Sequence, residues 1–442
     1  MKKKFLGIFI ITLSVLIWNK NVYAKDTVYS WNKYKDERLI EIIDSYNEEG
    51  KKDGLITGGT YLDEKEEHYD VMLLKYSKSG KLKWSFTYQK SSDDSLYDID
   101  YTYSEEGTID GYLMVMSRPF DKEESQINTN TLFVKINLAG EQEWEKEGGI
   151  GEKEKITKIT PIMTDTNTLD GYIAIGEKND NQAFISKYDR DCNLVWKKDY
   201  QEENKIVRLK DFITLKKENQ IIGYIVIKEE TEETEEDKTS IIKLDVEGNE
   251  QASFSIDKFA SYKLEKGNEG FIVYGITSEV KLEKGDYSYY LVKYNENLEE
   301  EWESIGNVPV EKEKELILLH QEKNNEIKDY TLYYTNSTDN SLELIRLDTE
   351  GLVIKKIKKI HNEYYDVENI KIDGNTIYIV GQINCPEDDN CDYDRNALLL
   401  ISDEDKVIEV EDSDSKNIFG ILGVITVLII IGIVFRRKKN RN

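Results

Sequence analysis

The sequence has only three cysteines, four prolines and three histidines in 442 residues. So few cysteines exclude a fold held together by disulfides, because exported domains of that kind carry many of them. The patterns His-Glu-x-x-His, Cys-x-x-Cys and Gly-x-Ser-x-Gly do not occur, so no motif indicates a zinc hydrolase, a dithiol enzyme or a serine hydrolase. We expect His68, His320 and His361 to be solvated surface residues. The sequence assigns no catalytic residue, metal ligand or cofactor.

Positive charge is also scarce, with 60 Lys and Arg against 87 Asp and Glu, a net charge of −27. Four lysines fall in the first 24 residues and six basic residues follow residue 415, with no acid in either segment, so the part between them carries −37. Such a charge repels nucleic acid and anionic surfaces and attracts basic partners weakly through salt. We therefore expect no nucleic-acid partner.

The N-terminus is typical of an export signal. Three lysines (2–4) precede an apolar run at 5–18, and Val22-Tyr23-Ala24 follows. Small side chains at this spacing predict cleavage after Ala24, which makes residues 1–24 a signal peptide. An uncleaved N-terminal anchor is the alternative, but the 14-residue run is shorter than a membrane span of about 20 residues.

The C-terminus has the features of a membrane anchor. Residues 418–435 contain no charge, and residues 436–442 are basic. A helix of this length spans about 27 Å at 1.5 Å per residue, and basic residues stay on the cytoplasmic side. The sequence predicts a linker at 413–417, a transmembrane helix at 418–435 and a cytoplasmic tail at 436–442. A sortase signal is excluded because residues 401–417 contain no proline.

Two polar segments invite a functional interpretation. The loop Cys385-Pro-Glu-Asp-Asp-Asn-Cys391 permits a local disulfide, while Cys192 lies in a turn and is expected to stay a free thiol. Acids at 388–396 alternate as in a calcium loop, but Ala397 and Asp403 stand where such a loop needs Gly and Glu. We expect a solvated hairpin tip there, and a solvated loop at the acidic run 229–237.

Internal repetition is the strongest pattern in the chain. A short apolar strand beginning at Asp-Gly or a similar pair occurs seven times, at intervals of 57, 60, 52, 47, 59 and 46 residues. A second strand follows in six copies with a basic residue in one register, at Lys75, Lys135, Lys187, Lys243, Lys293 and Arg346. Nine residues after this base stands Trp84, Trp144, Trp196 or Trp302, whereas copies four and six have Ala252 and Lys355.

Each repeat contains four predicted strands. The Gly-bounded apolar run suits a strand buried on both faces, and Gly permits close approach of backbones. A Gly-containing tetrad forms a hairpin to the Trp strand, and a further strand, such as 205–213, precedes the next Gly. Four strands in about 50 residues make one propeller blade. We expect an all-β, seven-bladed propeller over residues 25–412, with each repeated base on the solvated side of its strand.

The Asp-Gly strand, the strand ending near Asp, the Gly turn and the Trp resemble the quinoprotein-type propeller repeat and related repeats of exported Gram-positive proteins. In that family the Trp packs between neighbouring blades, and the resemblance carries this role to the four tryptophans only. Quinoprotein dehydrogenases also use adjacent cysteines, which this chain lacks. The resemblance therefore implies the fold without the cofactor.

Closure of the ring needs a strand from each end of the chain. The last copy supplies 376–380, 397–401 and 406–410. We expect residues 37–44 to complete the last blade, since free edges promote aggregation. Residues 28–31 resemble a Trp strand, and the sequence leaves their place open. An open solenoid is the structural alternative, but its units are usually shorter.

These observations favour a non-catalytic module at the surface of a Gram-positive bacterium. The abundance of Lys, Ile, Asn and Tyr indicates a low-GC genome. The module would be anchored by one helix, with a monomeric ectodomain that binds a protein or cell-wall ligand. One alternative is an extracellular polymer-acting hydrolase or lyase whose carboxylates converge on the central channel. Another is an assembly subunit whose acidic surface meets a basic partner. Two carboxylates with raised pKa in the channel would favour the enzyme.

Overall fold

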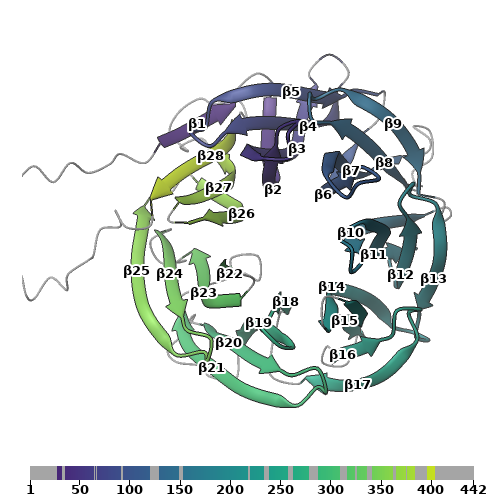
Figure 1. Cartoon of the computed structure of the whole chain (residues 1–442), viewed down its shortest axis with the longest axis vertical. Helices are drawn as coiled ribbons and strands as arrows, with labels where there is room; N and C mark the ends of the chain where they lie inside the picture. The colour runs from purple at the N-terminus through teal and green to yellow at the C-terminus, as the bar shows by residue number, and fades with distance from the viewer. Residues whose placement is uncertain are drawn as a thin grey trace, which may run out of the picture.

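The computed structural model describes residues 27–403, apart from residues 32–34, 64, 66, 91–92, 120–128, 149–152, 218–219, 233–237, 257–261, 278–286, 309–315, 324–325, 336–340, 362–364, 375 and 384–395. In this part every regular element is a β-strand, and the 28 strands form seven blades around a central axis (Figure 1). The predicted seven-bladed propeller of four-stranded blades is confirmed. No helix in the described part is long and apolar enough to cross a membrane.

The first four blades follow one another along the chain. Blade 1 contains β2 (Lys35–Tyr46), β3 (Lys52–Asp63), β4 (His68–Ser77) and β5 (Leu82–Tyr88). Blade 2 contains β6 (Ser95–Tyr103), β7 (Ile109–Pro119), β8 (Thr129–Asn137) and β9 (Gln142–Glu147). Blade 3 contains β10 (Glu154–Met163), β11 (Leu169–Lys178), β12 (Gln182–Asp189) and β13 (Leu194–Tyr200). Blade 4 contains β14 (Ile206–Lys217), β15 (Gln220–Thr231), β16 (Lys238–Leu244) and β17 (Glu250–Ile256).

The remaining three blades complete the ring. Blade 5 contains β18 (Lys263–Lys266), β19 (Phe271–Thr277), β20 (Tyr287–Tyr294) and β21 (Glu300–Val308). Blade 6 contains β22 (Leu316–Lys323), β23 (Glu326–Thr335), β24 (Ser341–Leu347) and β25 (Val353–His361). Blade 7 contains β26 (Tyr365–Asp373), β27 (Thr376–Ile383), β28 (Asn396–Asp403) and β1 (Thr27–Trp31).

Within a blade the strands run antiparallel, from the innermost at the axis to the outermost at the rim (Figure 1). The strand that precedes each Gly strand is the innermost strand of the same blade, as β14 is beside β15. The sequence interpretation placed it at the end of the previous unit, which is wrong. The hairpin that joins the two strands sets their pairing, because a tight turn fixes the register of antiparallel neighbours.

The ring closes through the first strand of the chain. Strand β1 pairs antiparallel with β28, in a register from Thr27↔Ile401 to Trp31↔Ala397. The expectation that residues 37–44 complete the last blade is wrong, because they lie in β2 and pair with β3 in blade 1. Residues 37–44 and the Gly strand are joined by one short turn, which favours pairing within blade 1. Residues 406–410 lie outside the described residues.

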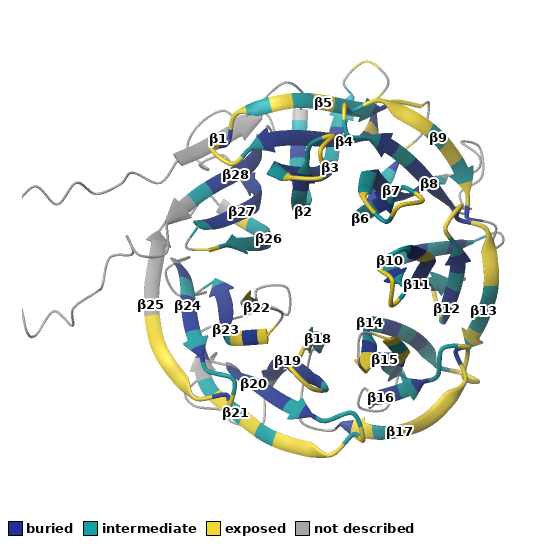
Figure 2. Cartoon of the chain, viewed as in Figure 1, coloured by how far each residue is buried: buried dark blue, intermediate teal, exposed yellow. Residues whose placement is uncertain are grey.

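Apolar packing occurs at each of the seven junctions between blades. Figure 2 shows the middle strands buried and much of the outer strands exposed. At the junction of blades 1 and 2, for example, Ile56 and Leu73 of blade 1 pack in one cluster with Tyr112 and Met114 of blade 2. Comparable clusters lie at the other six junctions. Burial between blades, which is the main driving force for folding, therefore holds the ring together.

Candidate functional site

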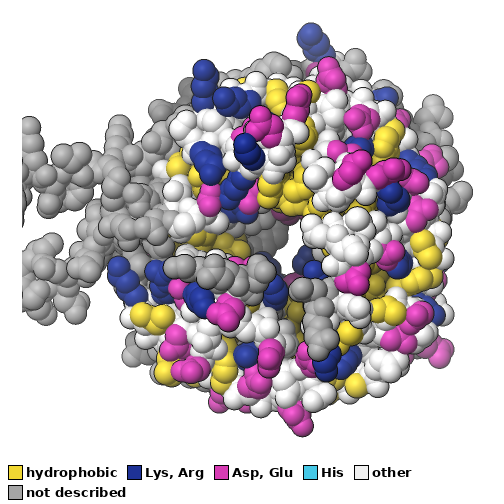
Figure 3. Space-filling view, viewed as in Figure 1, with side chains coloured by type: hydrophobic (Ala, Val, Ile, Leu, Met, Phe, Trp, Pro, Cys, Tyr) yellow, Lys and Arg dark blue, Asp and Glu magenta, His cyan; other side chains and the backbone are white. Residues whose placement is uncertain are grey.

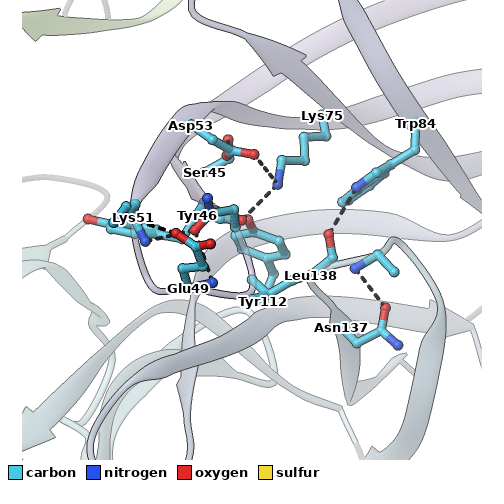
Figure 4. A network of polar contacts seen from close by, with 12 residues as sticks. Ser45, Tyr46, Glu49, Lys51, Asp53, Lys75, Trp84, Tyr112, Asn137 and Leu138 are labelled. Carbon is cyan, nitrogen blue, oxygen red and sulfur yellow. Dashed lines mark hydrogen bonds and ion pairs between the residues drawn. The ribbon is translucent and has the colours of Figure 1, made fainter.

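The repeated base is a structural residue. Lys75 has a side chain only 5% exposed, lies 3.0 Å from a carboxylate oxygen of Asp53 and donates to the carbonyl of Tyr46 at 2.7 Å (Figure 4). The expected position on a solvated face is therefore wrong at Lys75. The base ties the third strand of its blade to the Asp of the Asp-Gly pair. A buried lysine needs such a partner, because an unpaired buried charge is costly.

The same acid–base pair recurs at Lys135–Asp110 (2.9 Å) and Lys187–Asp170 (2.7 Å). In blade 6 Arg346 pairs with Asp329 (3.1 Å), which stands at the Gly position of the other repeats. Blades 4 and 5 differ: Lys243 donates to the carbonyl of Glu296, and Lys293 pairs with Glu301 at 2.7 Å. The base is thus paired with a backbone carbonyl in blade 4 and with a different acid in blade 5. The repeated base therefore does not provide a free ring of cations for a ligand.

The tryptophans lie between blades. The indole nitrogen of Trp84 donates to the carbonyl of Leu138 in the next blade at 3.2 Å (Figure 4), and that of Trp302 donates to the carbonyl of Thr349 at 3.1 Å. A Cβ placed on Gly140 would lie 2.7 Å from the Trp84 ring. The turn glycine therefore provides both the positive φ of the hairpin and the flat surface that the ring covers. Gly248 and Gly351 meet Trp196 and Trp302 in the same way.

Two blades use other residues at this contact. In blade 3 the turn residue is Cys192, which is a free, buried thiol with φ of 56° in the apolar cluster that Trp144 covers. Burial raises the pKa of this thiol to about 12, so it stays protonated and unreactive at neutral pH. In blade 5 Leu298 takes the turn position. It packs in one cluster with Phe254 of blade 4, the blade in which Ala252 stands at the Trp position.

Removing the indole tests this contact. We expect Trp84→Ala to lower the free energy of unfolding by about 2 kcal/mol, since the ring is half-buried and its hydrogen bond is also lost. Urea denaturation of the purified chain measures the change. The matched control is Lys83→Ala, at an exposed position on the same strand. Equal midpoints for the two variants would contradict a role for Trp84 between blades.

A ring of side chains lies at the centre of the propeller, where the space-filling view shows a hollow (Figure 3). The innermost strands contribute one residue each at the same register, opposite the fifth residue of the second strand counted from its Gly position. Asp329 occupies this Gly position in blade 6 and Thr376 in blade 7. We call this set the channel ring: Glu41, Asp98, Lys158, Asp211, Lys263, Ile317 and Asn369. In five blades a β-bulge immediately precedes the residue, and a bulge re-aims the side chain that follows it.

Contacts of the channel ring connect neighbouring blades. Asp98 accepts a hydrogen bond from the backbone N–H of Ile159 at 2.7 Å, and Asp211 accepts one from that of Leu264 at 2.8 Å. Lys158 forms an ion pair with Asp211, and Asn369 donates to Glu41 at 3.0 Å. Each of these contacts crosses from one blade to the next, so the ring joins the innermost strands of blades 2 to 5 and those of blades 7 and 1.

Two acids of the channel ring, Glu41 and Asp98, hold protons unusually tightly. Burial, followed by the charge of Asp98, raises the pKa of Glu41 to about 8. Burial also raises the pKa of Asp98 to about 6, although backbone N–H groups and Lys158 lower it. The pKa of Asp100, two residues further along β6, is raised well above its ordinary value by burial and by Asp98. Two carboxyl groups with raised pKa therefore do act on one another in the channel.

The histidines were expected on the solvated surface, and the structure corrects this for two of them. His68 is 5% exposed and lies 3.1 Å from Asp70. His320 on β22 lies 2.8 Å from Glu265 of blade 5 and 3.3 Å from Glu322. The side chain of His361 lies outside the described residues. A carboxylate accompanies each of these two histidines: Asp70 is a near neighbour of His68 along the chain, whereas Glu265 is distant from His320 and could not be assigned to it from the sequence.

His320 makes stability depend on pH. Burial disfavours the imidazolium, but the hydrogen bond and charge of Glu265 and the charge of Glu322 outweigh burial and raise the pKa. A raised histidine pKa stabilises the fold below the unfolded value of about 6.5, and this stabilisation is lost as the pH rises through the folded value. We expect His320→Gln to remove about 1 kcal/mol at pH 6 and little at pH 9, by urea denaturation. An equal loss at both pH values would contradict this.

Several sequence predictions concern residues outside the described part. These are cleavage after Ala24, the disulfide between Cys385 and Cys391, the polar loop at 388–395 and the transmembrane helix at 418–435. They remain predictions. Among the described residues, no group of three or more His, Cys, Asp or Glu is placed to hold a metal ion.

The channel ring was not predicted from the sequence. A repeated pattern nevertheless marks it: an apolar residue, any residue, the ring residue and a second apolar residue, as in Leu39-Ile-Glu41-Ile42, Leu96-Tyr-Asp98-Ile99, Ile156-Thr-Lys158-Ile159 and Leu209-Lys-Asp211-Phe212. The pattern is hard to recognise because the ring residue changes between acid, base, amide and apolar. Only the position is repeated.

Comparisons with known proteins give the following similarities. No family model and no curated protein sequence matches the chain. The β-propeller domain of the Trilobed protease from Pyrococcus furiosus is 10% identical, covering 86% of this chain and 100% of that domain with a TM-score of 0.46. The WD40 domain of SCAP from fission yeast is 11% identical, covering 86% and 99% with a TM-score of 0.41. An acylaminoacyl peptidase from Pyrococcus horikoshii is 10% identical, covering 87% and 54% with a TM-score of 0.45.

Proposed function

We propose that this chain is a non-catalytic binding module, anchored by residues 418–435 at the outer face of a Gram-positive cell membrane, whose propeller binds a protein or cell-wall ligand. The sequence of both termini supports the location. The propeller supplies a rigid ring whose faces are available to a partner. Fold alone does not decide function, so the proposal depends on the chemistry of the channel.

The observation that carries this proposal is that the charged groups of the channel ring are committed to the fold. The two carboxylate oxygens of Asp98 accept hydrogen bonds from the N–H groups of Ile99 and Ile159. Lys158 and Asp211 form an ion pair, and Glu41 is held by Asn369. A catalytic acid or base must reach a substrate proton. These side chains instead contact neighbouring blades, as expected of a rigid scaffold.

One observation favours a second function, an extracellular hydrolase or lyase. Glu41, with a pKa of about 8, would be protonated at neutral pH, and Asp98, with a pKa of about 6, would be mostly ionised. Pairs of carboxyl groups whose pKa values lie apart serve as acid and base in enzymes that act on polymers. The hydrogen bonds that fix Asp98 make us favour the binding module.

The experiment that tests the proposal uses the full-length chain with an affinity tag in its native envelope. Cells are treated with a short crosslinker, and bound material is purified at low and at physiological salt. A specific partner retained at physiological salt supports the binding module, because purely charge-driven contacts weaken with salt. Retention at low salt alone would instead support the assembly role of the acidic surface.

The enzyme alternative is tested with the same preparation. The purified chain and its Glu41→Gln variant are incubated with envelope polymers, and released fragments are measured. Turnover by the natural chain that is abolished by Glu41→Gln would overturn the non-catalytic proposal. The matched control is Glu203→Gln, at an exposed position in the turn before β14, which should leave any turnover unchanged.

A further inference from the structure

A second group of buried charges lies between blades 1 and 2, away from the channel ring. It consists of His68 and Asp70 at the start of β4, Asp94 just before β6, and Arg118 near the end of β7; we call it the junction cluster. Asp70 and Asp94 are completely buried. His68 lies 3.1 Å from Asp70, and Arg118 lies 3.5 Å from Asp94. The channel ring does not include these residues, and the proposed function does not use them.

The hydrogen bonds of this cluster are incomplete. Neither carboxylate oxygen of Asp94 accepts a hydrogen bond from the described residues, and neither does Oδ2 of Asp70. Nε and Nη2 of Arg118 donate none, so the guanidinium approaches Asp94 without forming a directed bond. A buried carboxylate in this state is costly, because it has lost water without gaining donors. A proton on Asp94 removes this charge and with it the repulsion from Asp70.

The backbone connects this cluster to the junction of the two blades. The N–H of Asp94 donates to the carbonyl of Tyr69 at 2.8 Å, and the N–H of Tyr69 donates to the side chain of Asp93 at 2.9 Å. Residues 93–94 are thereby attached to β4 while they lead directly into β6. A change in the charge of Asp94 therefore acts on the segment through which blade 2 is joined to blade 1.

Charges from each neighbouring element act on Asp94. Asp70 and His68 face it from β4, Lys90 and Asp93 lie on the connecting segment, and Arg118 approaches from β7. Arg118 also lies over the ring of Tyr88 on β5, with its guanidinium carbon 5.2 Å from the ring centre. Burial, followed by the charge of Asp70, raises the pKa of Asp94 to about 7, and burial also raises that of Asp70.

We propose that Asp94 is a proton-controlled latch between blades 1 and 2: the neutral carboxyl holds residues 93–94 on β4, and ionisation beside Asp70 loosens this junction. The folded protein binds the proton more tightly than the unfolded chain does. The junction is therefore most stable at acidic pH, and its stability falls as the pH rises from the ordinary value of 3.8 to about 7. Below that range Asp94 is protonated in both the folded and the unfolded protein.

The test is hydrogen–deuterium exchange of the full-length chain between pH 5 and pH 9, corrected for the intrinsic exchange rate. In the natural chain we expect peptides covering 67–76 and 93–100 to open at least tenfold more often above pH 7 than at pH 5, while blades 4 and 5 change little. Asp94→Asn should abolish this transition, because its side chain does not titrate. Asp70→Asn should move the transition to lower pH, because it removes a like charge.

The matched control is Asp165→Asn, at an exposed position in a turn of blade 3, which should leave the transition unchanged. A transition that persists in Asp94→Asn, or one that Asp70→Asn leaves at the same pH, would overturn the proposal. A uniform change across all blades would do the same. Should Asp94→Asn not fold, the shift of the exchange transition in Asp70→Asn decides.

Discussion

Gly54→Ala is expected to lower the free energy of unfolding by about 3 kcal/mol, because no space exists for a methyl group. A Cβ built on Gly54 would lie 1.9 Å from the carbonyl oxygen of Tyr76 on the next strand. This contact is with backbone, so a side-chain rotation cannot relieve it, and β3 and β4 would have to separate. Urea denaturation of the purified chain, followed by tryptophan fluorescence, measures the change.

The same close approach is repeated around the ring. A Cβ at the equivalent position would lie 2.0–2.5 Å from a carbonyl oxygen of the third strand at Gly111, Gly171, Gly223 and Gly270. The matched control is Gly50→Ala, in the turn before β3, where φ is +70° but nothing lies within 4 Å. This variant carries only the cost of the backbone conformation, about 1 kcal/mol. Equal effects at Gly54 and Gly50 would show that close approach is not what selects Gly54.

Replacing β1, residues 27–31, by a Gly-Ser segment of the same length is expected to have a still larger effect. All five residues pair with β28, and about 1 kcal/mol for each paired position gives roughly 5 kcal/mol. The substitution also leaves the outer edge of β28 unpaired, and an open edge recruits other strands. We expect a lower midpoint in urea together with oligomers in sedimentation velocity.

The outcome distinguishes two ways of closing the ring. Unchanged stability would mean that β1 is not the closing strand and that residues 406–410 can take its place. The control is a synthetic peptide covering residues 25–33, added to the substituted chain, which should restore the monomer if the lost pairing is the cause. A peptide of the same composition in scrambled order should not restore it.

The repeat predicted the fold because it combines three local requirements. Gly54 and its equivalents permit close strand pairing, Gly140 and its equivalents close hairpins, and the Trp at a fixed offset covers the next turn. Each requirement is marked by one residue type at a fixed position within the repeat. Prediction failed for ring closure, because a five-residue strand such as β1 finds its partner more than 360 residues away. Trp31 of this strand pairs with Ala397, and its position corresponds to Tyr88 in blade 1 and not to Trp84. It therefore does not stand at the Trp position of the repeat.

The sequence by itself determined the number of blades, their strands and the turn glycines, because these depend on side-chain periodicity and on backbone conformation within one repeat. Only the tertiary structure decided which charges meet. The pairs Asp98–Ile159 and Glu265–His320 and the approach of Arg118 to Asp94 each join different segments of the chain. Electrostatic energies depend on distance and burial, and both are set when the blades pack into the ring. The same type of acidic residue is therefore solvated in one blade and holds a proton in another.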